Sequence, residues 1–284
     1  MSPDADRDVE PPDLARDQVL VVDDDRFAPG TVALVTGAAS GIGRATAVAL
    51  AVNGLTVAGV DVDEDGLAKT EAVAADLDAD GAVEPVVADL RTDAPAAVEA
   101  AADLGALRFL ANVAGLQHVA PLEEFPMATY DRMQEVMLRA PVELSKHALS
   151  HLRAAGGGVV GNMASVHGHY VTADKAAYNV VKFGLRGLTQ SIAAEGDGTV
   201  RAFSVSTGYV KTPLVTDQIP DTADRRGVSV DEVIEDVMLG QARTGEMMDP
   251  IDVGNLFVFG FSEHASHLNG GDLLFDGGMT LTYE

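Results

Sequence analysis

Residues 31–43 read TVALVTGAASGIG, a short apolar run that passes directly into a glycine-rich turn. The run is rich in β-branched residues and is typical of a buried strand. The next stretch, GRATAVALAVNG (43–54), has the pattern of a helix. A glycine-rich turn between a first strand and a helix lets the backbone approach a pyrophosphate, which the helix N-terminus can bind. Because glycines also form ordinary turns, the rest of the chain has to distinguish these two interpretations.

Apolar runs and helical patterns continue to alternate along the rest of the chain. Strands that alternate with crossover helices predict a parallel sheet covered on both faces, and the continuously apolar strands suit burial on both faces. We therefore expect an α/β fold, a single-domain Rossmann-type doubly wound parallel sheet. The further strands are expected at 55–61, 82–90, 107–115, 157–165, 199–208 and 271–278, and the helices at 64–77, 93–104, 126–153, 173–195 and 250–262.

The first part of the chain has a different composition. Residues 1–29 are rich in Asp and Pro and are interpreted as an acidic N-terminal extension. Their one apolar patch, VLVV (19–22), is expected to pack on the domain formed by residues 30–284.

Charge and composition exclude several kinds of partner. The 284 residues carry 44 Asp and Glu against 19 Lys and Arg, a net charge of −25 at pH 7. Such a charge repels nucleic acid and anionic membranes, and no run of about eighteen apolar residues or apolar leader is visible. We expect a cytoplasmic protein, adapted to high salt because strong screening tolerates an acidic, lysine-poor surface. The absence of cysteine excludes disulfides and thiolate metal sites, and no metal site is expected.

The second expected strand ends in an acidic residue. Asp61 lies eighteen positions after Gly43, close to the roughly 20 expected for the acid that binds the adenosine ribose of a dinucleotide. The alternative is a solvated residue at a strand end. A carboxylate here would repel a 2′-phosphate, and no Lys or Arg follows in VDVDEDG (60–66). The pattern favours NAD over NADP.

A serine, a tyrosine and a lysine in the middle of the chain suit proton transfer to a carbonyl or alcohol oxygen. Tyrosine has an unperturbed pKa of about 10, and an ammonium group nearby lowers that pKa. Lys182 lies four positions after Tyr178, on the same helix face, and Ser165 at a strand end can polarise the substrate oxygen. The alternative is a surface contact between Tyr178 and Lys182. Tyr170 is rejected as the acid because Asp174, not lysine, follows it by four.

Five ordered motifs resemble the short-chain dehydrogenase/reductase family: TGAASGIG (36–43), Asp89-Leu90, NVAG (112–115), Ser165 and YNVVK (178–182). The resemblance covers nearly all of residues 30–284. It implies an NAD-dependent oxidoreductase in which the serine, tyrosine and lysine have the catalytic roles above and the lysine also holds the nicotinamide ribose. It implies cofactor contacts at Gly37, Ser40, Gly41, Ile42, Gly43, Asp61, Asp89, Leu90, Asn112, Ala114, Gly115, Tyr178, Lys182, Gly208, Val210 and Thr212.

Segments at strand ends resemble a subgroup of the family, the D-3-hydroxybutyrate dehydrogenases. The matching positions imply that Gln117, His167, Lys175 and Gln218 bind a substrate carboxylate. A small hydroxy acid has little apolar surface, so charge-assisted hydrogen bonds have to supply its binding, and an acidic protein needs a local cation to attract it. The alternatives are a solvated helix-start residue for Lys175 and a core histidine for His167. Residues 212–245, helical and acidic, match the mobile lid of the family.

The chain also departs from the family. Thr207-Gly208 stands in place of Pro-Gly, and Met279 stands in place of a tryptophan. Met137 stands in place of an asparagine whose backbone carbonyl, in the family, holds a water that relays protons. Pro141 has no N–H to bond the carbonyl of residue 137 and kinks the helix there. Our hypothesis is that Pro141 frees the Met137 carbonyl to restore the water site; the alternative is a kink tolerated for packing.

The leading expectation is an NAD-dependent oxidoreductase that interconverts D-3-hydroxybutyrate, or a close short 3-hydroxy acid, and its 3-keto acid. The alternatives are a dehydrogenase for another small alcohol or polyol, and a non-catalytic NAD-binding regulatory protein. The family resemblance also implies a homotetramer, built partly through the helices at 126–153 and 173–195.

Overall fold

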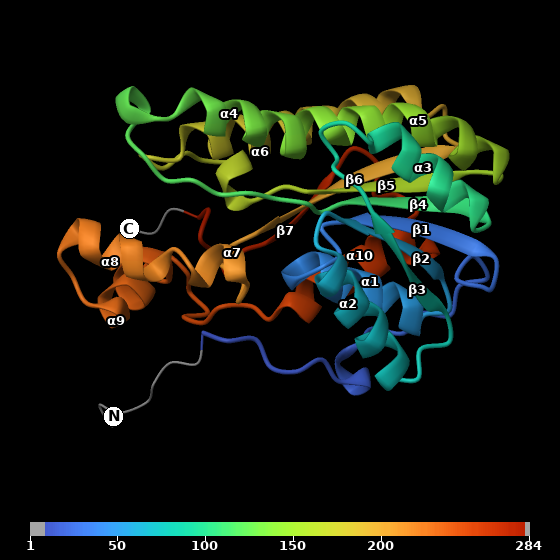
Figure 1. The fold of residues 1–284 in the computed structure, drawn as a ribbon, viewed down its shortest axis with the longest axis horizontal. Coiled ribbons are helices and arrows are strands. Elements are labelled where there is room, and N and C mark those ends of the chain that lie inside the picture. Colours follow the sequence, from blue (N-terminus) through green and yellow to red (C-terminus); the bar gives the residue numbers. More distant parts are fainter. Residues whose placement is uncertain (1–8, 282–284) are drawn as a thin grey trace.

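A seven-stranded parallel sheet forms the centre of the molecule, in a computed structural model that describes residues 9–281 (Figure 1). The strand order is β3-β2-β1-β4-β5-β6-β7. The winding changes direction between β1 and β4, which confirms the expected Rossmann-type doubly wound sheet. The strands are β1 (Thr31–Thr36), β2 (Thr56–Asp61), β3 (Ala82–Val87), β4 (Ala106–Asn112), β5 (Gly158–Met163), β6 (Val200–Thr207) and β7 (Asp272–Phe275).

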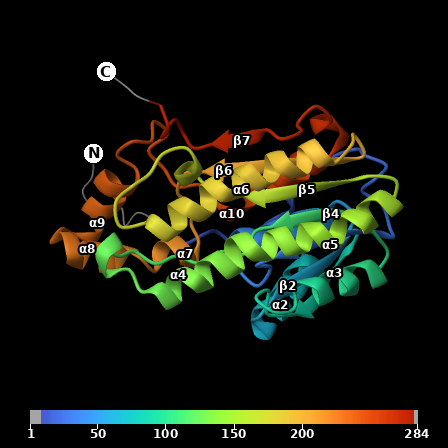
Figure 2. The same ribbon diagram turned by 90° about the horizontal axis from the view of Figure 1, so that it is seen from above.

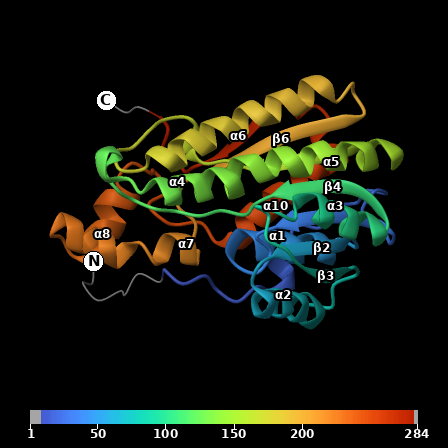
Figure 3. The ribbon, with the colours of Figure 1, turned by 45° about the horizontal axis from the view of Figure 1, so that its top comes forward.

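Helices cover both faces of the sheet (Figures 2 and 3). One face carries α1 (Gly41–Val52), α2 (Glu64–Asp76) and α10 (Pro250–Phe261). The other carries α3 (Ala94–Asp103), α5 (Ala140–Ala154) and α6 (Ala176–Glu195).

The single helix expected at 126–153 has an interruption. It consists of α4 (Met127–Gln134), a π-helical turn at Glu135–Arg139, and α5. The turn ends at Arg139, two residues before Pro141, which cannot donate a backbone hydrogen bond.

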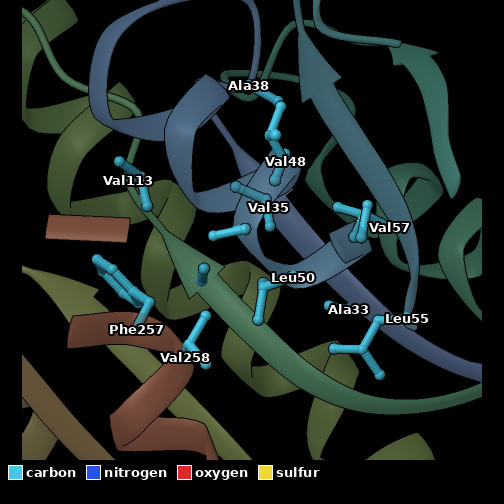
Figure 4. Packing of buried hydrophobic residues seen from close by; sticks show 14 of the residues in the cluster. Ala33, Val35, Ala38, Val48, Leu50, Leu55, Val57, Val113, Phe257 and Val258 are labelled. Atoms are coloured by element: carbon cyan, nitrogen blue, oxygen red, sulfur yellow. The ribbon is translucent and has the colours of Figure 1, made fainter. Parts of the chain in front are cut away.

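The larger core lies between the sheet and the α1–α10 layer. Val35 of β1, Leu50 of α1, Val57 of β2 and Phe257 of α10 meet there with no exposed surface (Figure 4). All six residues of β1 are buried, as expected of a central parallel strand. This packing places the C-terminal end of β1, where the glycine turn begins, at the edge of a rigid core.

The expectation of strands buried on both faces is wrong for the sheet edges. In β3 only Val83 is buried, and Glu84 and Pro85 are exposed. An edge strand has only one neighbour to cover it, and proline is tolerated there because it has no N–H to donate. β7, at the other edge, has no fully buried residue.

The segment before β1 packs along the domain, while residues 1–8 and 282–284 lie outside the described residues. Val19 and Phe27 are buried in the larger core. The Asn255 side chain accepts from the Leu20 N–H at 2.8 Å and donates to the Gln18 carbonyl at 2.8 Å. The apolar patch at 19–22 thus contacts the domain, and the proposed boundary at residue 29 stays a prediction.

The segment proposed as a lid is helical and has a small apolar cluster of its own. It contains α7 (Pro213–Thr216), α8 (Ile219–Arg226), α9 (Val230–Glu232) and a π-helical turn, Val233–Met238. Ile219, Val233 and Met247 are buried in this cluster, against which Val9 packs. Over the described residues, no helix has the length and apolarity needed to cross a membrane.

Candidate active site

The glycine turn has room only for glycine at two of its positions. Gly37 has φ +71°, and a Cβ on it would lie 2.8 Å from the Ala114 Cα. A Cβ on Gly43 would lie 2.0 Å from the Gly37 carbonyl oxygen. The missing side chains leave the first turn of α1 and its free N–H groups open to a phosphate. The turn therefore fits a dinucleotide.

Thr36, at the end of β1, connects the glycine turn to the segment after β4. These two strands are neighbours at the point where the winding of the sheet changes direction. Its hydroxyl oxygen accepts from the N–H groups of Val113 at 2.9 Å and Ala114 at 3.1 Å. The NVAG segment after β4 is thereby held against the turn after β1, at the point where open α/β sheets bind ligands.

A cavity of about 510 Å³ opens between these two segments. Eleven of the expected cofactor residues line it: Gly37, Ser40, Gly41, Ile42, Gly43, Asp61, Asp89, Leu90, Ala114, Gly115 and Thr212. The others lie outside this lining. Asn112 is buried and donates to the Asn162 side chain at 2.8 Å, Val210 is buried, and Gly208 lines a second cavity of about 360 Å³.

Asp61 lies in the wall of the cavity with its carboxylate held by backbone groups. It accepts from the N–H of Ala39 at 3.2 Å and of Val62 at 2.7 Å. Arg44, in the first turn of α1, is engaged elsewhere, since its guanidinium donates to the Ala39 carbonyl and to the Thr70 hydroxyl. The cavity wall at Asp61 is thus acidic.

Two arginines that the sequence interpretation did not single out also line the cavity. Arg91 donates to the Asp89 carboxylate at 3.0 Å, and this hydrogen bond lowers the pKa of Asp89 to about 2. Arg132 of α4 lines the same cavity, and its charge contributes to the lowering. Arg91 could have been found from the sequence, because it directly follows the Asp89-Leu90 motif. Arg132 could be placed at the cavity only from the fold.

The proposed acid–base group lies where β5 ends and α6 begins, and its residues are not part of the cavity lining. Ser165 is buried, and Tyr178, in the first turn of α6, is half-buried. The Lys182 ammonium lies 5.2 Å from the centroid of the Tyr178 ring and donates to the Met163 carbonyl at 2.7 Å. The structure thus brings the three expected residues together.

The pKa of Tyr178 differs from the sequence expectation. Burial raises it to about 12, opposed only by a hydrogen bond from Ser165. Burial also lowers the pKa of Lys182 to about 7, which weakens the ammonium charge that was expected to favour the phenolate. Desolvation therefore outweighs charge at this pair, and the expected lowering of the Tyr178 pKa is wrong for this structure.

His167 lies between the serine and the surface. Its Nδ1 is 3.3 Å from the Ser165 hydroxyl oxygen, and its Nε2 is 3.0 Å from the Thr172 hydroxyl oxygen. The ring also contacts Tyr178, with 5.6 Å between centroids. Burial, with the charges of two lysines, lowers the pKa of His167 to about 3, so the ring is neutral at neutral pH.

Lys175 lies at the start of α6, after Asp174 in a left-handed conformation (φ +65°). Its ammonium lies 5.8 Å from the centroid of the Tyr209 ring. Burial, then the charge of Arg226, lowers the pKa of Lys175. Tyr209 and Arg226 come from segments after β6, which no local pattern connects to this lysine.

The two expected glutamines are engaged with nearby backbone. The Gln117 Oε1 accepts from the N–H of His118 at 3.0 Å. Gln218, at the N-terminus of α8, donates to the Leu214 carbonyl. These hydrogen bonds would have to be given up for the same side-chain atoms to bind a carboxylate.

The two methionines that replace family residues have defined contacts. The Met137 sulfur accepts from the Leu116 N–H at 3.2 Å and so holds the loop after NVAG. A Cβ on Gly208 would lie 2.7 Å from the Met279 sulfur, which shows that Met279 packs over this glycine.

Comparison with known proteins agrees with this geometry. A family model described as enoyl-(acyl carrier protein) reductase matches residues 37–280. A D-beta-hydroxybutyrate dehydrogenase of Rhizobium meliloti (strain 1021) is 34% identical over 254 residues, which cover 87% of this chain and 98% of that protein. A D-threitol dehydrogenase of Mycolicibacterium smegmatis is 35% identical over 273 residues, which cover 94% of this chain and 100% of that protein.

A solved structure from Beutenbergia cavernae, of a protein proposed to be an NAD(P)-dependent gluconate 5-dehydrogenase, contains NADP at low occupancy. It is 31% identical with a TM-score of 0.78, and the match covers 89% of this chain and 98% of that one. These matches extend over the glycine turn, the cavity and the serine, tyrosine and lysine together. The chain therefore belongs to the short-chain dehydrogenase/reductase family, whose members are oxidoreductases that bind NAD or NADP.

Proposed function

We propose that this oxidoreductase interconverts a short 3-hydroxy acid, D-3-hydroxybutyrate or a close relative, and its 3-keto acid, with NAD as cofactor. The observation that carries the proposal is the environment of Lys175. Its ammonium is half-buried, and no carboxylate of the described residues forms an ion pair with it, in a chain with 44 acidic residues. An unpaired, partly desolvated cation is costly, and a bound anion offsets that cost.

The other residues of the site fit the same proposal. Ser165 would donate a hydrogen bond to the reacting oxygen, and Tyr178 would take the hydroxyl proton in oxidation or return it in reduction. Lys175 would bind the carboxylate, and Gln117 and Gln218 would turn toward it. Bound NAD supplies the acceptor for the hydride that leaves the carbinol carbon.

NAD, rather than NADP, is proposed because of Asp61. Its carboxylate is part of the cavity wall, and Arg44 is engaged by backbone carbonyls, so the cavity wall there repels a 2′-phosphate. The relative with bound NADP makes this a question for direct measurement. Rates with NAD and with NADP at equal concentration would answer it, and a preference for NADP would overturn the assignment.

A dehydrogenase for a neutral polyol is the second candidate. The threitol dehydrogenase relative favours it, and Met279 supports it because a flexible thioether shapes a pocket less strictly than an indole. If the substrate is a polyol, Lys175 would bind another group, such as a polyol hydroxyl.

The discriminating experiment follows NADH formation in molar KCl with a panel of 3-hydroxy acids and neutral polyols. We expect turnover of D-3-hydroxybutyrate or of an acid of similar length. Turnover of a polyol with none of the acids would overturn the carboxylate assignment. Molar KCl and low salt are compared, because the proposed adaptation to high salt requires the activity to fall when the salt is diluted.

A homotetramer is also proposed. Apolar side chains are exposed on the helices expected to form it: Val142 of α5, and Val180 and Phe183 of α6. Exposed apolar residues on neighbouring helices indicate an interaction surface. Light scattering after size exclusion would test it, and a monomer in molar KCl would contradict the proposal.

A further inference from the structure

The segment proposed as a lid, residues 212–245, packs around an apolar cluster that is separate from the cores on the two faces of the sheet. The buried members of this lid cluster are Ile219, Ala223, Val233, Ile234, Met238, Leu239 and Met247. Over the described residues, Val9 is the one residue packed in or against the cluster that comes from outside residues 209–247. The start of the described chain therefore supplies the lid cluster with an apolar contact from a distant segment.

The chain that leaves the lid cluster is next attached to the core of the domain. Leu14 packs against the larger core, between the sheet and the α1–α10 layer. The Arg16 guanidinium donates to the Leu77 carbonyl at 2.8 Å and forms an ion pair with Asp80 at 2.8 Å. In Figures 1 and 3 this segment, coloured blue, runs from the lid helices to the α1–α2 layer. Residues 9–19, called the strap below, thus connect the lid to the core.

Two prolines make the middle of the strap stiff. Pro11 and Pro12 lie between the attachment points Val9 and Leu14. Proline fixes φ, and it also keeps the residue before it extended. Residues 11–15 belong to no helix or strand, and a proline-rich segment of this kind is a semi-rigid spacer. Because a stiff strap cannot lengthen, movement of the lid away from the core has to detach Val9.

The lid cluster contacts the proposed site through Tyr209. The Tyr209 side chain packs against the cluster, and its ring centroid lies 5.8 Å from the Lys175 ammonium. At the start of the lid, Thr212 and Leu214 line the cofactor cavity. The position of the lid therefore affects both the lysine proposed to bind the anion and the wall of the cavity.

We propose that the strap is a positioning element of the active site, which holds the lid over the cofactor cavity and beside Lys175. The proposal rests on the lid role of residues 212–245 but not on the identity of the substrate. Val9 detaches whenever the lid opens, and the opened lid loses the apolar contact of this side chain. Pro11 and Pro12 limit the freedom that the detached strap gains, so they also favour the closed lid.

The strap is strong enough to bias the lid and too weak to lock it. Val9 is half-buried. Half of the stabilisation from a fully buried valine side chain corresponds to roughly three- to tenfold in the equilibrium between closed and open lid. Each proline contributes about two- to fivefold more, through the smaller conformational freedom of the detached strap. A bias of this size suits a segment that has to open in every turnover.

The first test follows hydrogen exchange of the lid in the full chain without substrate or cofactor. Val9→Ser removes the apolar contact, and Val21→Ser, at a residue that is 64% exposed just after the strap, is the matched control. We expect exchange of amides within residues 219–239 to become about three- to tenfold faster in Val9→Ser. Exchange in β1 should stay unchanged, and Val21→Ser should behave as the wild type.

Three results of this test would overturn the proposal. Wild-type exchange of the lid in Val9→Ser would show that the strap does not restrain it. Equally faster exchange in β1 would show a loss of overall stability in place of a release of the lid. The same acceleration in Val21→Ser would mean that the contact of Val9 with the lid cluster has no special part in the effect.

A second variant keeps both attachment points and removes only the stiffness. Pro11→Gly combined with Pro12→Gly leaves Val9 and Leu14 in place. We expect faster exchange of the lid amides, about fourfold or more for the pair of substitutions, with exchange in β1 again unchanged. Wild-type exchange of the lid in this double variant would overturn the strap as a stiff connection.

A third measurement uses turnover. With a substrate identified by the panel of acids and polyols, Val9→Ser should raise KM by up to the factor seen in exchange. The value of kcat should stay the same or rise, because the lid opens more readily. A lower kcat with unchanged KM would place the effect on the chemical step and overturn the proposal. Failure of the proposed function would appear separately, as wild-type protein without turnover whose lid exchange still responds to Val9→Ser.

Discussion

The Lys182 ammonium group donates a hydrogen bond to the Met163 carbonyl oxygen at 2.7 Å, in a position that leaves the residue 3% exposed. One carbonyl does not replace the hydration shell of a charged group, and burial lowers the pKa of Lys182 to about 7. The protein thus keeps a destabilising cation next to its proposed acid–base residue.

Lys182 makes the stability of the protein depend on pH. Its pKa is about 7 when folded and about 10.5 when unfolded, so between these values the unfolded chain binds more protons and stability rises with pH. The difference corresponds to roughly 5 kcal/mol. We expect Lys182→Met to be more stable than wild type at neutral pH and below, with the gap closing as the pH rises toward 10. Denaturant unfolding at a series of pH values measures it; a gap that is constant with pH would contradict the assignment.

Substitutions of Lys175 and of Lys182 should have different effects on the kinetics. Lys182→Ala should abolish turnover with every substrate, because it removes the group beside Tyr178. Lys175→Ala should mainly raise KM for acids, roughly tenfold or more for loss of a charge-assisted bond, and spare any neutral alcohol that is accepted. Lys146→Ala, exposed on α5, is the control in steady-state kinetics. Identical defects in the two active-site variants would refute the division of roles.

Asp61 should control the choice of cofactor. Asp61→Asn keeps one oxygen, which can still accept the Val62 N–H, but removes the charge and the second oxygen, which accepts the Ala39 N–H. We expect the ratio of kcat/KM with NADP to that with NAD to rise about tenfold or more, because a repulsion of about 1–4 kcal/mol at close range is lost. Asp65→Asn, on the exposed face of α2, is the matched control. A ratio that does not change would mean that Asp61 lies away from the ribose.

Gly43 should tolerate no side chain. The Cβ of Gly43→Ala would meet the backbone oxygen of Gly37 at 2.0 Å, so the turn has to shift. We expect a loss of about 1–3 kcal/mol in stability and weaker NADH binding, measured by denaturation and by fluorescence titration. Gly187→Ala in α6 has open space for its Cβ and should be neutral or stabilising. Normal NADH affinity in Gly43→Ala would show that the cofactor does not contact this turn.

Pro141 is expected to maintain the π-helical turn at Glu135–Arg139. Pro141→Ala restores an N–H that can bond the Met137 carbonyl in a regular helix. If that carbonyl holds a water used in proton transfer, kcat should fall and its pH profile should shift. Steady-state kinetics over a range of pH tests this, with Pro95→Ala at the start of α3 as control. Unchanged turnover and pH profile would leave the turn as a packing feature.

Features that depend on residues close together in the sequence could be predicted from the sequence. The pattern of apolar runs predicted the doubly wound sheet, because burial on both faces of a parallel sheet leaves a local signature. The glycine turn and the Ser165, Tyr178 and Lys182 set were recognisable for the same reason, since each lies within one strand–helix unit. The single helix at 126–153 was predicted with nearly correct ends, and Pro141 marked the place of its interruption.

The tertiary structure decided what depends on contacts between distant segments. The strand order placed β3 at an exposed edge, brought Tyr209 to Lys175, and placed Arg132 of α4 in the wall of the cofactor cavity. Burial set the pKa values of Tyr178 and Lys182 against the expectation from charge alone, because desolvation depends on everything packed around a group rather than on its neighbours in the chain.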